Sequence, residues 1–458
     1  MNALIVDGGA RAHALAWKLA QSPECGDIYI APGRAGIANV VRTAMTPGHR
    51  PIEATDIAAC LRFAKDHDTG LLLPTADDPL GLGIVDGFYD IFQDKDHLAF
   101  GPTKAAAEIE GSKAYMKQLA EQAGVPTAEY KVFETQNDKD IIQYVGSQPF
   151  PVVVKASERA EGKGVRVCEN LDKVKEFLGE LRMAGHFGKP GQEIVVEEYL
   201  EGPEISLHAW CDGETYRMFP FAMQDHKNIT EDINSPMTGG MGVIAPLPGI
   251  TPEDIELLGK IFVEPFIKAL KAAGHPFKGI LYPGLKLTAQ GPKLLEINAR
   301  PGDPEIQACM PLLETDLVPI MRACAEGKLS QLPEIKWRQV AAICIVLAAE
   351  GYPKATKKGA IITGLELLED RDDVLVFQGG TKMNDEEEVI VNGGRALSVV
   401  TIGREDEPLG RVMKRGYEEI LPIRFGGKRP QIRTGIGKTA LSPLFRERVA
   451  IMRQVLAA

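Results

Sequence analysis

The clearest candidates for chemistry in this sequence are a carboxylate and an amide near position 300. Glu296 and Asn298 fall in a predicted strand, where residues two apart point to the same face. Their oxygens are hard ligands of the kind that Mg²⁺ prefers. Arg300 points the same way and could hold a transferring phosphoryl group. An exposed strand face could carry these three residues, but the acids Asp303 and Glu305 in the next turn favour a metal and phosphate site.

A lysine beside a glycine-containing turn is the second candidate. Lys155 ends the run Pro151–Lys155, and Gly162, Lys163 and Gly164 follow closely. This arrangement suits a nucleotide whose phosphates must be covered and neutralised. A solvated lysine at a strand end is nevertheless the commoner case for any single lysine.

The segment Val195–Glu204 runs from a predicted strand directly into a turn. Such a hinge could offer backbone N–H and C=O groups to an adenine edge, and a carboxylate to ribose hydroxyls. Paired glutamates at a strand end, here Glu197 and Glu198, are more often surface charge than ligands. The segment alone leaves both interpretations open.

A glycine pair follows the first predicted strand. Gly8 and Gly9 precede a helical stretch, and a strand, a glycine turn and a helix N-terminus together form a natural anion site. The dinucleotide-binding spacing is absent, because Ala10 and Ala12 interrupt it. A tight turn without a ligand explains the pair equally well.

Alternating strands and helices must position these residues in the first hundred positions. Strands are expected at Ala3–Val6, Asp27–Ala31 and Gly70–Pro74, with a helix at His13–Gln21. The alternation predicts a doubly wound parallel sheet. In such a sheet ligands lie beyond the carboxyl ends of the strands, here at the loops containing Gly8, Gly33 and Asp77.

The remainder of the chain predicts two further units and a tail. We expect a long helix at Thr103–Ala123 and a helical region at Pro252–Ala273, and short apolar strands near the C-terminus indicate a small α+β domain. The other expected strands are Ala128–Phe133, Val152–Lys155, Ile194–Tyr199, Ala341–Ala348, Val389–Asn392 and Ala396–Ile402. The predicted domains cover 1–101, 102–327 (with a mobile lobe at about 125–195) and 328–427, followed by a basic tail with a terminal helix at 428–458.

Composition narrows the class of protein. The formal charge of −11 over 458 residues argues against a nucleic-acid binder. Seven scattered cysteines without a C-x-x-C pair indicate free thiols in a reducing compartment. No apolar run approaches a membrane span, and the N-terminus lacks the regions of a signal peptide. We expect a cytoplasmic enzyme.

Many short motifs in order resemble the phosphoribosylamine–glycine ligase family, ATP-grasp enzymes of purine biosynthesis. The resemblance runs from the first strand to about residue 425, and no single motif decides it. The motifs begin at His13 (H-A-L-A-W-K-L-A), Ala31 (A-P-G-R-A-G), Phe100 (F-G-P-T), Glu110 (E-G-S-K), Val125 (V-P-T-A-E-Y), Gln224 (Q-D-H-K), Thr238 (T-G-G-M-G), Gly302 (G-D-P-E), Gly351 (G-Y-P), Gly380 (G-T-K) and Val391 (V-N-G-G-R).

The resemblance implies a central ATP-grasp fold between the parallel-sheet domain and the C-terminal domain, with a role for each matching residue. At ATP it places the two phosphate-binding lysines, the flap, the adenine hinge and the ribose-binding acid: Lys113, Lys155, Gly162, Lys163, Gly164, Glu197, Glu198, Tyr199, Leu200 and Glu204. At phosphoribosylamine and the reacting centre it places Gly8, Gly9, Arg11, Asp77, Asp225, His226, Lys227, Thr238, Gly239, Gly240, Met241 and Gly242. Glu296 and Asn298 match the metal ligands, and the catalytic set is Arg300, Lys155 and Asp303.

Departures from the family pattern cluster at the substrate positions. The family's G-N-G-G-R-E-H is Asp7 to His13 here (D-G-G-A-R-A-H), and its G-P-E-A-P-L begins at Thr75 (T-A-D-D-P-L). The flap K-A-D-G-L-A-A-G-K-G reads K-A-S-E-R-A-E-G-K-G, and G-P-N-T carries Ser235 and Met237. Arg34 replaces an asparagine, and D-I-G-W becomes G-I-G-K, ending at Lys438. The ATP lysines and metal ligands are retained.

The implied reaction is the ATP-dependent joining of glycine to phosphoribosylamine through an acyl phosphate, with Mg²⁺ or Mn²⁺ and only small-molecule partners. The resemblance suggests a monomer or weak dimer that binds neither nucleic acid nor membrane. A diverged ligase of the same fold with another acid or amine is the nearest alternative. A non-catalytic nucleotide-binding regulator has no need of paired metal ligands, and a biotin-dependent carboxylase fits the T-G-G-M-G and G-D-P-E loops less well.

Overall fold

The computed structural model describes residues 1–33, 42–45, 51–134, 138–158, 164–183, 193–232, 234–369 and 371–457. The N-terminal part is a parallel sheet in the order β3-β2-β1-β4-β5, which confirms the predicted doubly wound arrangement. Its strands are β1 Asn2–Val6, β2 Ile28–Ala31, β3 Arg42–Thr43, β4 Thr69–Pro74 and β5 Leu98–Ala99, and its helices are α1 Ala10–Leu19, α2 Ile57–Asp66, α3 Asp77–Gly81 and α4 Ile84–Ile91.

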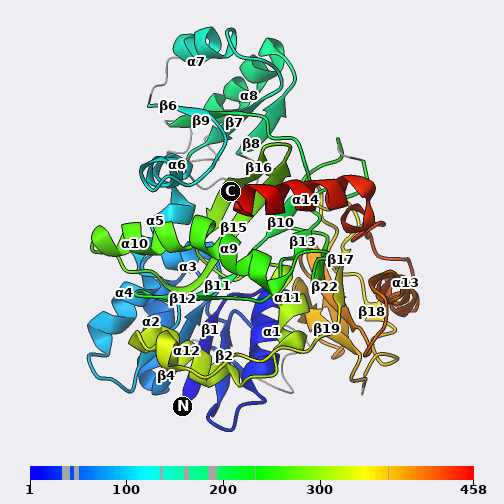
Figure 1. Ribbon diagram of the computed structural model, residues 1–458. Helices are drawn as coiled ribbons and strands as arrows, with labels where there is room; N and C mark the ends of the chain where they lie inside the picture. The colour runs from blue at the N-terminus through cyan, green and yellow to red at the C-terminus, as the bar shows by residue number, and fades with distance from the viewer. Residues whose placement is uncertain are drawn as a thin grey trace.

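A small lobe projects from the body at the top of Figure 1. It is an antiparallel sheet in the order β6-β9-β7-β8 with two helices, and its buried side chains form a core of their own. The elements are β6 Tyr130–Phe133, α7 Asp138–Val145, β7 Val152–Ala156, β8 Val165–Cys168, α8 Leu171–Met183 and β9 Ile194–Glu198.

The chain enters this lobe through two helices where one was predicted. α5 Lys104–Gly111 ends at Ser112, whose backbone is extended, and α6 Lys113–Gln122 begins immediately after it. The Ser112 hydroxyl accepts the N–H of Tyr115 as the N-cap, and it lies 3.2 Å from the hydroxyl of Ser157. The single long helix was therefore a wrong prediction, because Ser112 caps a new helix and sets Lys113 at its first position.

The body of the molecule is built on a second antiparallel sheet. Strands β10 Glu204–Ser206, β15 Lys278–Thr288, β11 Ala209–Asp212 and β12 Tyr216–Met218 lie side by side, and β16 Gly291–Asn298 pairs with β15. Helices α11 Glu305–Cys309 and α12 Leu317–Glu326 follow β16. The predicted helical region at 252–273 is two helices, α9 Pro252–Phe262 and α10 Glu264–Ala272, because Pro265 in the first turn of α10 cannot continue the backbone ladder of α9.

A third antiparallel sheet joins segments that lie far apart in the sequence. β13 Gln224–Asp225 pairs with β14 Gly242–Ala245, which pairs with β17 Ala342–Ala348, and β22 Arg395–Ile402 and β19 Val374–Gln378 follow. The sheet thus crosses residue 328, where we placed a domain boundary. Two small strand pairs complete the C-terminal part, β18 Ile362–Thr363 with β23 Arg424–Phe425 and β20 Thr381–Met383 with β21 Val389–Val391, together with helices α13 Leu409–Glu419 and α14 Pro443–Ala457.

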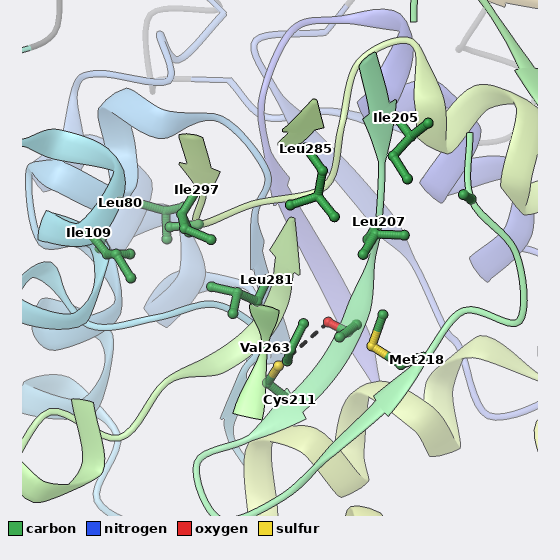
Figure 2. Close-up of a cluster of buried hydrophobic side chains, with 14 of the residues drawn as sticks. Leu80, Ile109, Ile205, Leu207, Cys211, Met218, Val263, Leu281, Leu285 and Ile297 are labelled. Atoms are coloured by element: carbon green, nitrogen blue, oxygen red, sulfur yellow. Dashed lines mark hydrogen bonds between the residues drawn. The ribbon is translucent and has the colours of Figure 1, made fainter. Parts of the chain in front are cut away.

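One hydrophobic core binds the N-terminal part to the body. Leu80 of α3 and Ile109 of α5 lie near Ile297 of β16 and Leu281 of β15 in Figure 2, and all four side chains are buried. A fully buried leucine or isoleucine contributes about 1.5–3 kcal/mol of transfer free energy. The loops at the carboxyl edge of the parallel sheet are therefore held firmly against β16.

The cysteines are free thiols, as their scattered spacing predicts. Six of the seven are buried, and Cys25 is partly exposed. Among the described residues no helix combines the length and the apolar character needed to cross a membrane.

Candidate active site

Two lysines from different elements form the first part of the site. Lys155 is the last but one residue of β7. Lys113 begins α6, and its backbone N–H donates to the carbonyl of Ser157. Burial lowers the pKa of Lys113, Glu296 opposes this, and the nearby Lys155 lowers the pKa further. The two predicted phosphate-binding lysines therefore share one electrostatic environment with the predicted metal ligand Glu296.

Glu197 of β9 lies between Lys155 and a third lysine. Its carboxylate is 2.8 Å from Lys155 Nζ and 3.2 Å from Lys117 Nζ. The side chain of Lys117 is 0% exposed and that of Glu197 2%. Burial lowers the pKa of Lys117 to about 8, although Glu197 raises it. The carboxylate thus holds both lysines in place, and Lys117 was missed because it stands in no motif.

The other predicted adenine-hinge residues follow Glu197 in the chain, and one predicted flap residue contacts β7. The Glu198 carboxylate accepts from Lys293 Nζ at 2.7 Å and from the N–H of Glu129 at 3.1 Å. Tyr199 and Leu200 come directly after β9, and the carbonyl of Gly164 accepts the N–H of Ala156. The other two flap residues that we predicted, Gly162 and Lys163, lie outside the described residues.

Glu296 and Asn298 lie at the end of β16 as predicted. Lys227 Nζ is 3.0 Å from Glu296 Oε1, and it is the main cause that lowers the pKa of Glu296 to about 2, against the effect of burial. Asn298 is buried, its Oδ1 accepts from Arg300 Nη2 at 3.2 Å, and its Nδ2 has no protein partner among the described residues. The ionised carboxylate of Glu296 and the amide oxygen of Asn298, which keeps a second lone pair beside its bond from Arg300, are oxygen ligands of the kind that a hard divalent cation takes.

Arg300 is fixed by the protein. Its Nε is 3.2 Å from Glu110 Oε1, and Glu110 also accepts the N–H of Ala299 at 2.7 Å. Burial disfavours the charge of Arg300, but Glu110 and then Asp77 raise its pKa above the usual value. Asp77 opens α3, so Arg300 connects the metal edge with the N-terminal sheet.

The glycine loop after β1 meets the loop after β16. Asp7 accepts from Arg11 Nε at 2.8 Å, from the N–H of Gly9 at 2.9 Å and from the hydroxyl of Thr75 at 3.0 Å. A Cβ atom on Gly9 would lie 3.5 Å from Asp303 Oδ2, which shows how closely the two loops approach. Gly8, the preceding residue, also has an interaction within the protein.

A cavity lies beside Lys227 and Glu296. It is lined by Glu204, Ile205, Ser206, Asp225, Lys227, Tyr282, Gly284, Leu285 and Leu295. Burial and the neighbouring Glu305 raise the pKa of Asp225 well above its usual value. For Glu204, the charges of Lys227 and Lys286 outweigh burial and lower the pKa. The cavity therefore combines a carboxyl that resists ionisation with a carboxylate that favours it.

The loop from Asp225 to Gly242 folds back on itself. The hydroxyl and the N–H of Thr238 both donate to the carbonyl of Lys227, at 2.8 and 2.7 Å. His226 is buried: its Nε2 accepts the N–H of Gly437 at 3.1 Å, and its Nδ1 lies 3.3 Å from the carbonyl of Gly242. Both ring nitrogens are thus engaged by the protein itself, and Met241 is buried beside them.

Arg395 of β22 is a site residue to which we assigned no role. It donates to the carbonyl of Gly239 at 2.7 Å, to the carbonyl of Asp303 at 3.0 Å and to Asp303 Oδ2 at 2.9 Å. Burial opposes the charge of Asp303, but Arg395 and then Arg11 lower its pKa. The V-N-G-G-R motif was the signal that could have revealed Arg395. Arg395 therefore joins the glycine turn at Gly239 and Gly240 to the loop that contains Asp303.

The fold and this site define an ATP-grasp enzyme, and comparisons with known proteins agree. The family model for phosphoribosylglycinamide synthetase matches in three parts: its N domain at residues 1–110, its ATP-grasp (A) domain at 111–306 and its C domain at 342–439. A phosphoribosylamine–glycine ligase of Rhodopirellula baltica is 39% identical over 432 residues, which cover 93% of this chain and 95% of the relative.

Solved structures give the same result. Phosphoribosylamine–glycine ligase from Thermotoga maritima superimposes with a TM-score of 0.77 at 26% identity, over 95% of this chain and 100% of that one. The biotin carboxylase domain of the Hydrogenobacter thermophilus 2-oxoglutarate carboxylase, solved with MgADP, has a TM-score of 0.69 over 98% of this chain and 95% of that one. At 17% identity this second likeness shows a shared fold alone.

The chain belongs to the phosphoribosylglycinamide synthetase family. It is an ATP-dependent ligase of purine biosynthesis, and the predictions of fold class, family and enzyme class are confirmed.

Proposed function

We propose that this enzyme joins glycine to 5-phosphoribosylamine at the cost of ATP, and forms glycinamide ribonucleotide, ADP and phosphate. The observation that carries the proposal is the convergence of two lysines on one carboxylate. After Lys227, the charges of Lys155 and Lys113 help to lower the pKa of Glu296, and Glu296 in turn opposes the lowering of the pKa of Lys113 by burial. The relatives that match this chain over nearly its whole length are named phosphoribosylamine–glycine ligase, after these two substrates.

The reaction would proceed in two displacements. A carboxylate oxygen of glycine attacks the γ-phosphorus of ATP, the bond to the β-phosphate oxygen breaks, and ADP leaves. Lys113, Lys155 and Arg300 offset the charge on the phosphates. The amine nitrogen then attacks the carbonyl carbon of glycyl phosphate, phosphate leaves and the nitrogen loses a proton. Exclusion of water from the site would protect the acyl phosphate while both steps occur.

Glu296 and Asn298 are the residues that would hold a divalent cation. Mg²⁺, or Mn²⁺ with the same oxygen ligands, would supply further neutralisation of phosphate charge when bound. Lys227 now occupies one side of the Glu296 carboxylate and keeps it ionised, because the pKa of Glu296 is lowered to about 2.

One observation favours an alternative amine. Asp7, which replaces a glycine of the family pattern, accepts hydrogen bonds from the N–H of Gly9 and the guanidinium of Arg11. These groups would otherwise receive an anion at the carboxyl edge of the parallel sheet. A diverged ligase with another acid or amine is therefore the second candidate.

The remaining properties follow from chemistry already described. Seven free thiols suit a reducing compartment, so we place the enzyme in the cytoplasm. With a formal charge of −11 it has small-molecule partners and binds neither nucleic acid nor membrane as part of its function. We propose a monomer or weak dimer.

Phosphate release by the purified enzyme tests the proposal. The assay contains MgATP, glycine and freshly generated phosphoribosylamine, and each component is omitted in turn. Release that requires all three, with a product of the mass of glycinamide ribonucleotide, supports the proposal. Silence with these substrates, together with release in a panel of other acids and amines, would establish the diverged ligase.

The variant Glu296→Ala tests the metal assignment within the same assay. We expect turnover to fall by a factor of about 10³ or more, because phosphoryl transfer depends on the charge of the cation. The folded state should persist, since the side chain of Glu296 is 42% exposed and its ion pair with Lys227 is partly open to solvent. Turnover close to that of the wild type would remove Glu296 from the ligand set.

A further inference from the structure

The C-terminal segment Arg433–Lys438, called the anchor segment below, lies against the outer side of the 225–242 loop. Arg433 Nη1 donates to the carbonyl of Asn228 at 2.8 Å and to that of Thr230. Lys438 Nζ lies 3.0 and 3.1 Å from the two carboxylate oxygens of Glu231, which also accepts the hydroxyl of Thr434 at 2.6 Å. Residues more than 200 positions apart are thus joined by a set of direct contacts.

A buried contact continues the anchor segment into the middle of the loop. The N–H of Gly437 donates to His226 Nε2, so this nitrogen carries no proton and the proton of a neutral ring lies on Nδ1. The Nδ1–H can then donate to the carbonyl of Gly242 on the neighbouring strand. Burial, followed by the charge of Arg433, lowers the pKa of His226 to about 4, so the ring is neutral as this geometry requires.

The anchor segment is itself fixed and shaped for the loop. The hydroxyl of Tyr417 donates to the carbonyl of Arg433 and accepts the N–H of Ile436, each at 2.9 Å. Gly435 has a φ of +73°, and a Cβ atom there would lie 2.6 Å from a carboxylate oxygen of Glu231. Only glycine allows this approach.

The 225–242 loop, which the anchor segment contacts, touches site residues both near its start and near its end. At its start Lys227 contacts Glu296 at 3.0 Å, and at its end Gly239 accepts from Arg395, which is bound to Asp303. Because positional errors of about 1 Å can cost much of an enzyme's rate, the anchoring of this loop bears directly on catalysis.

We propose that Arg433–Lys438 is a positioning element of the reaction, which fixes the loop so that Lys227 and the Thr238–Gly242 turn remain aligned at the acid substrate. The anchor segment contacts no substrate; it acts through the loop. The proposal rests on the proposed function in that the acid bound beside Lys227 is taken to be glycine.

Steady-state kinetics of Arg433→Met, with Arg429→Met as the matched control, tests the proposal. Arg429 is exposed and stands four residues before Arg433. Loss of the two hydrogen bonds from a charged donor should raise the KM for glycine about tenfold and leave the KM for ATP within about twofold. Arg433→Lys should recover part of the loss, and Arg429→Met should match the wild type.

The exposed ion pair gives an independent test if Arg433→Met does not fold. The side chains of Lys438 and Glu231 are 65% and 45% exposed, so salt should screen their attraction. In the wild type the KM for glycine should rise with salt by about twofold, and in Lys438→Met it should start higher and lose this salt dependence. A purely structural contact would not produce that difference.

These experiments distinguish a failure of the proposed function from a failure of the positioning role. A wild type that is silent with glycine and phosphoribosylamine contradicts the proposed function. An active wild type overturns the positioning role in two cases: the KM for glycine is unchanged in both Arg433→Met and Lys438→Met, or the KM for ATP rises as much as that for glycine.

Discussion

Replacement of Glu197 by glutamine should destabilise the protein by about 3–5 kcal/mol at pH 7, because it removes one partner of a buried ion pair. The amide keeps the shape of the side chain but leaves Lys117 and Lys155 together without a carboxylate. Each attraction, across about 3 Å at an effective dielectric of about 20, has a gross magnitude of about 5 kcal/mol. Desolvation offsets more than half of that sum. Lys117 keeps one acceptor, the hydroxyl of Thr127 at 2.7 Å.

The destabilisation should depend on pH in a defined direction. Burial already lowers the pKa of Lys117 from 10.5 to about 8 in the presence of Glu197, so without this carboxylate the pKa falls further. Between the folded and the unfolded pKa of a lysine, the unfolded chain binds more protons, and the stability of the folded state rises with pH. In the variant this rise begins at lower pH than in the wild type. The stability difference should therefore shrink between pH 7 and pH 9.

Urea denaturation at these two pH values measures both effects. The matched control is Glu198→Gln, the next residue, whose carboxylate pairs with Lys293 at 2.7 Å but whose side chain is 36% exposed. An exposed pair of this kind is worth less than about 1 kcal/mol. A free energy of unfolding of Glu197→Gln within about 1 kcal/mol of the wild-type value at pH 7 would contradict this prediction. A difference from the wild type that grows as the pH rises would contradict it as well.

Two further substitutions test the proposed amine-binding and acid-binding parts of the site. Asp7→Gly frees the N–H of Gly9 and the guanidinium of Arg11 for an anion. The KM for a phosphorylated amine should therefore fall about tenfold while the KM for ATP stays constant. Titration of the amine in the phosphate-release assay measures this KM, and an increase would contradict the prediction. Arg395→Lys cannot make both hydrogen bonds of the guanidinium, to Asp303 and to the carbonyl of Gly239. The kcat/KM should therefore fall about 10²-fold while the unfolding midpoint stays unchanged. A kcat/KM equal to that of the wild type would refute this role.

The sequence was a good guide wherever the signal is local. The parallel sheet follows from strands that end in glycine turns and helices, and β1 with its glycine pair lies where the pattern placed it. Lys155 and Glu296 were found because each lies near the end of a strand and is followed by a turn with further polar residues. Alternation of side chains along β16 was enough to put Glu296 and Asn298 on the same face.

The sequence was a poor guide wherever the site depends on pairing across long separations. Arg11 donates to the carbonyl of Pro301, 290 residues away, and no local pattern contains that distance. Lys117 lies one turn after Lys113 on α6 and looks like an ordinary surface lysine until β9 brings Glu197 against it. The break at Ser112 was also hidden, because the hydrogen bond that accompanies it involves Ser157, which directly follows β7.

The proposed acid-binding part of the site, at the 225–242 loop, and the proposed amine-binding part, at Asp7, differ in how far their side chains can be replaced without loss of contacts. On the acid side Arg395 and Arg433 hold one loop from two directions, and both donate to backbone carbonyls, so side-chain changes within that loop leave their contacts intact. Ser235 and Met237 are such changes. On the amine side the contacts of Asp7 are made by its side chain, and three donors satisfy its carboxylate. Under the proposed function, a phosphate that binds there must displace the ion pair between Asp7 and Arg11. We therefore expect discrimination among amines to be decided at the edge of the N-terminal sheet.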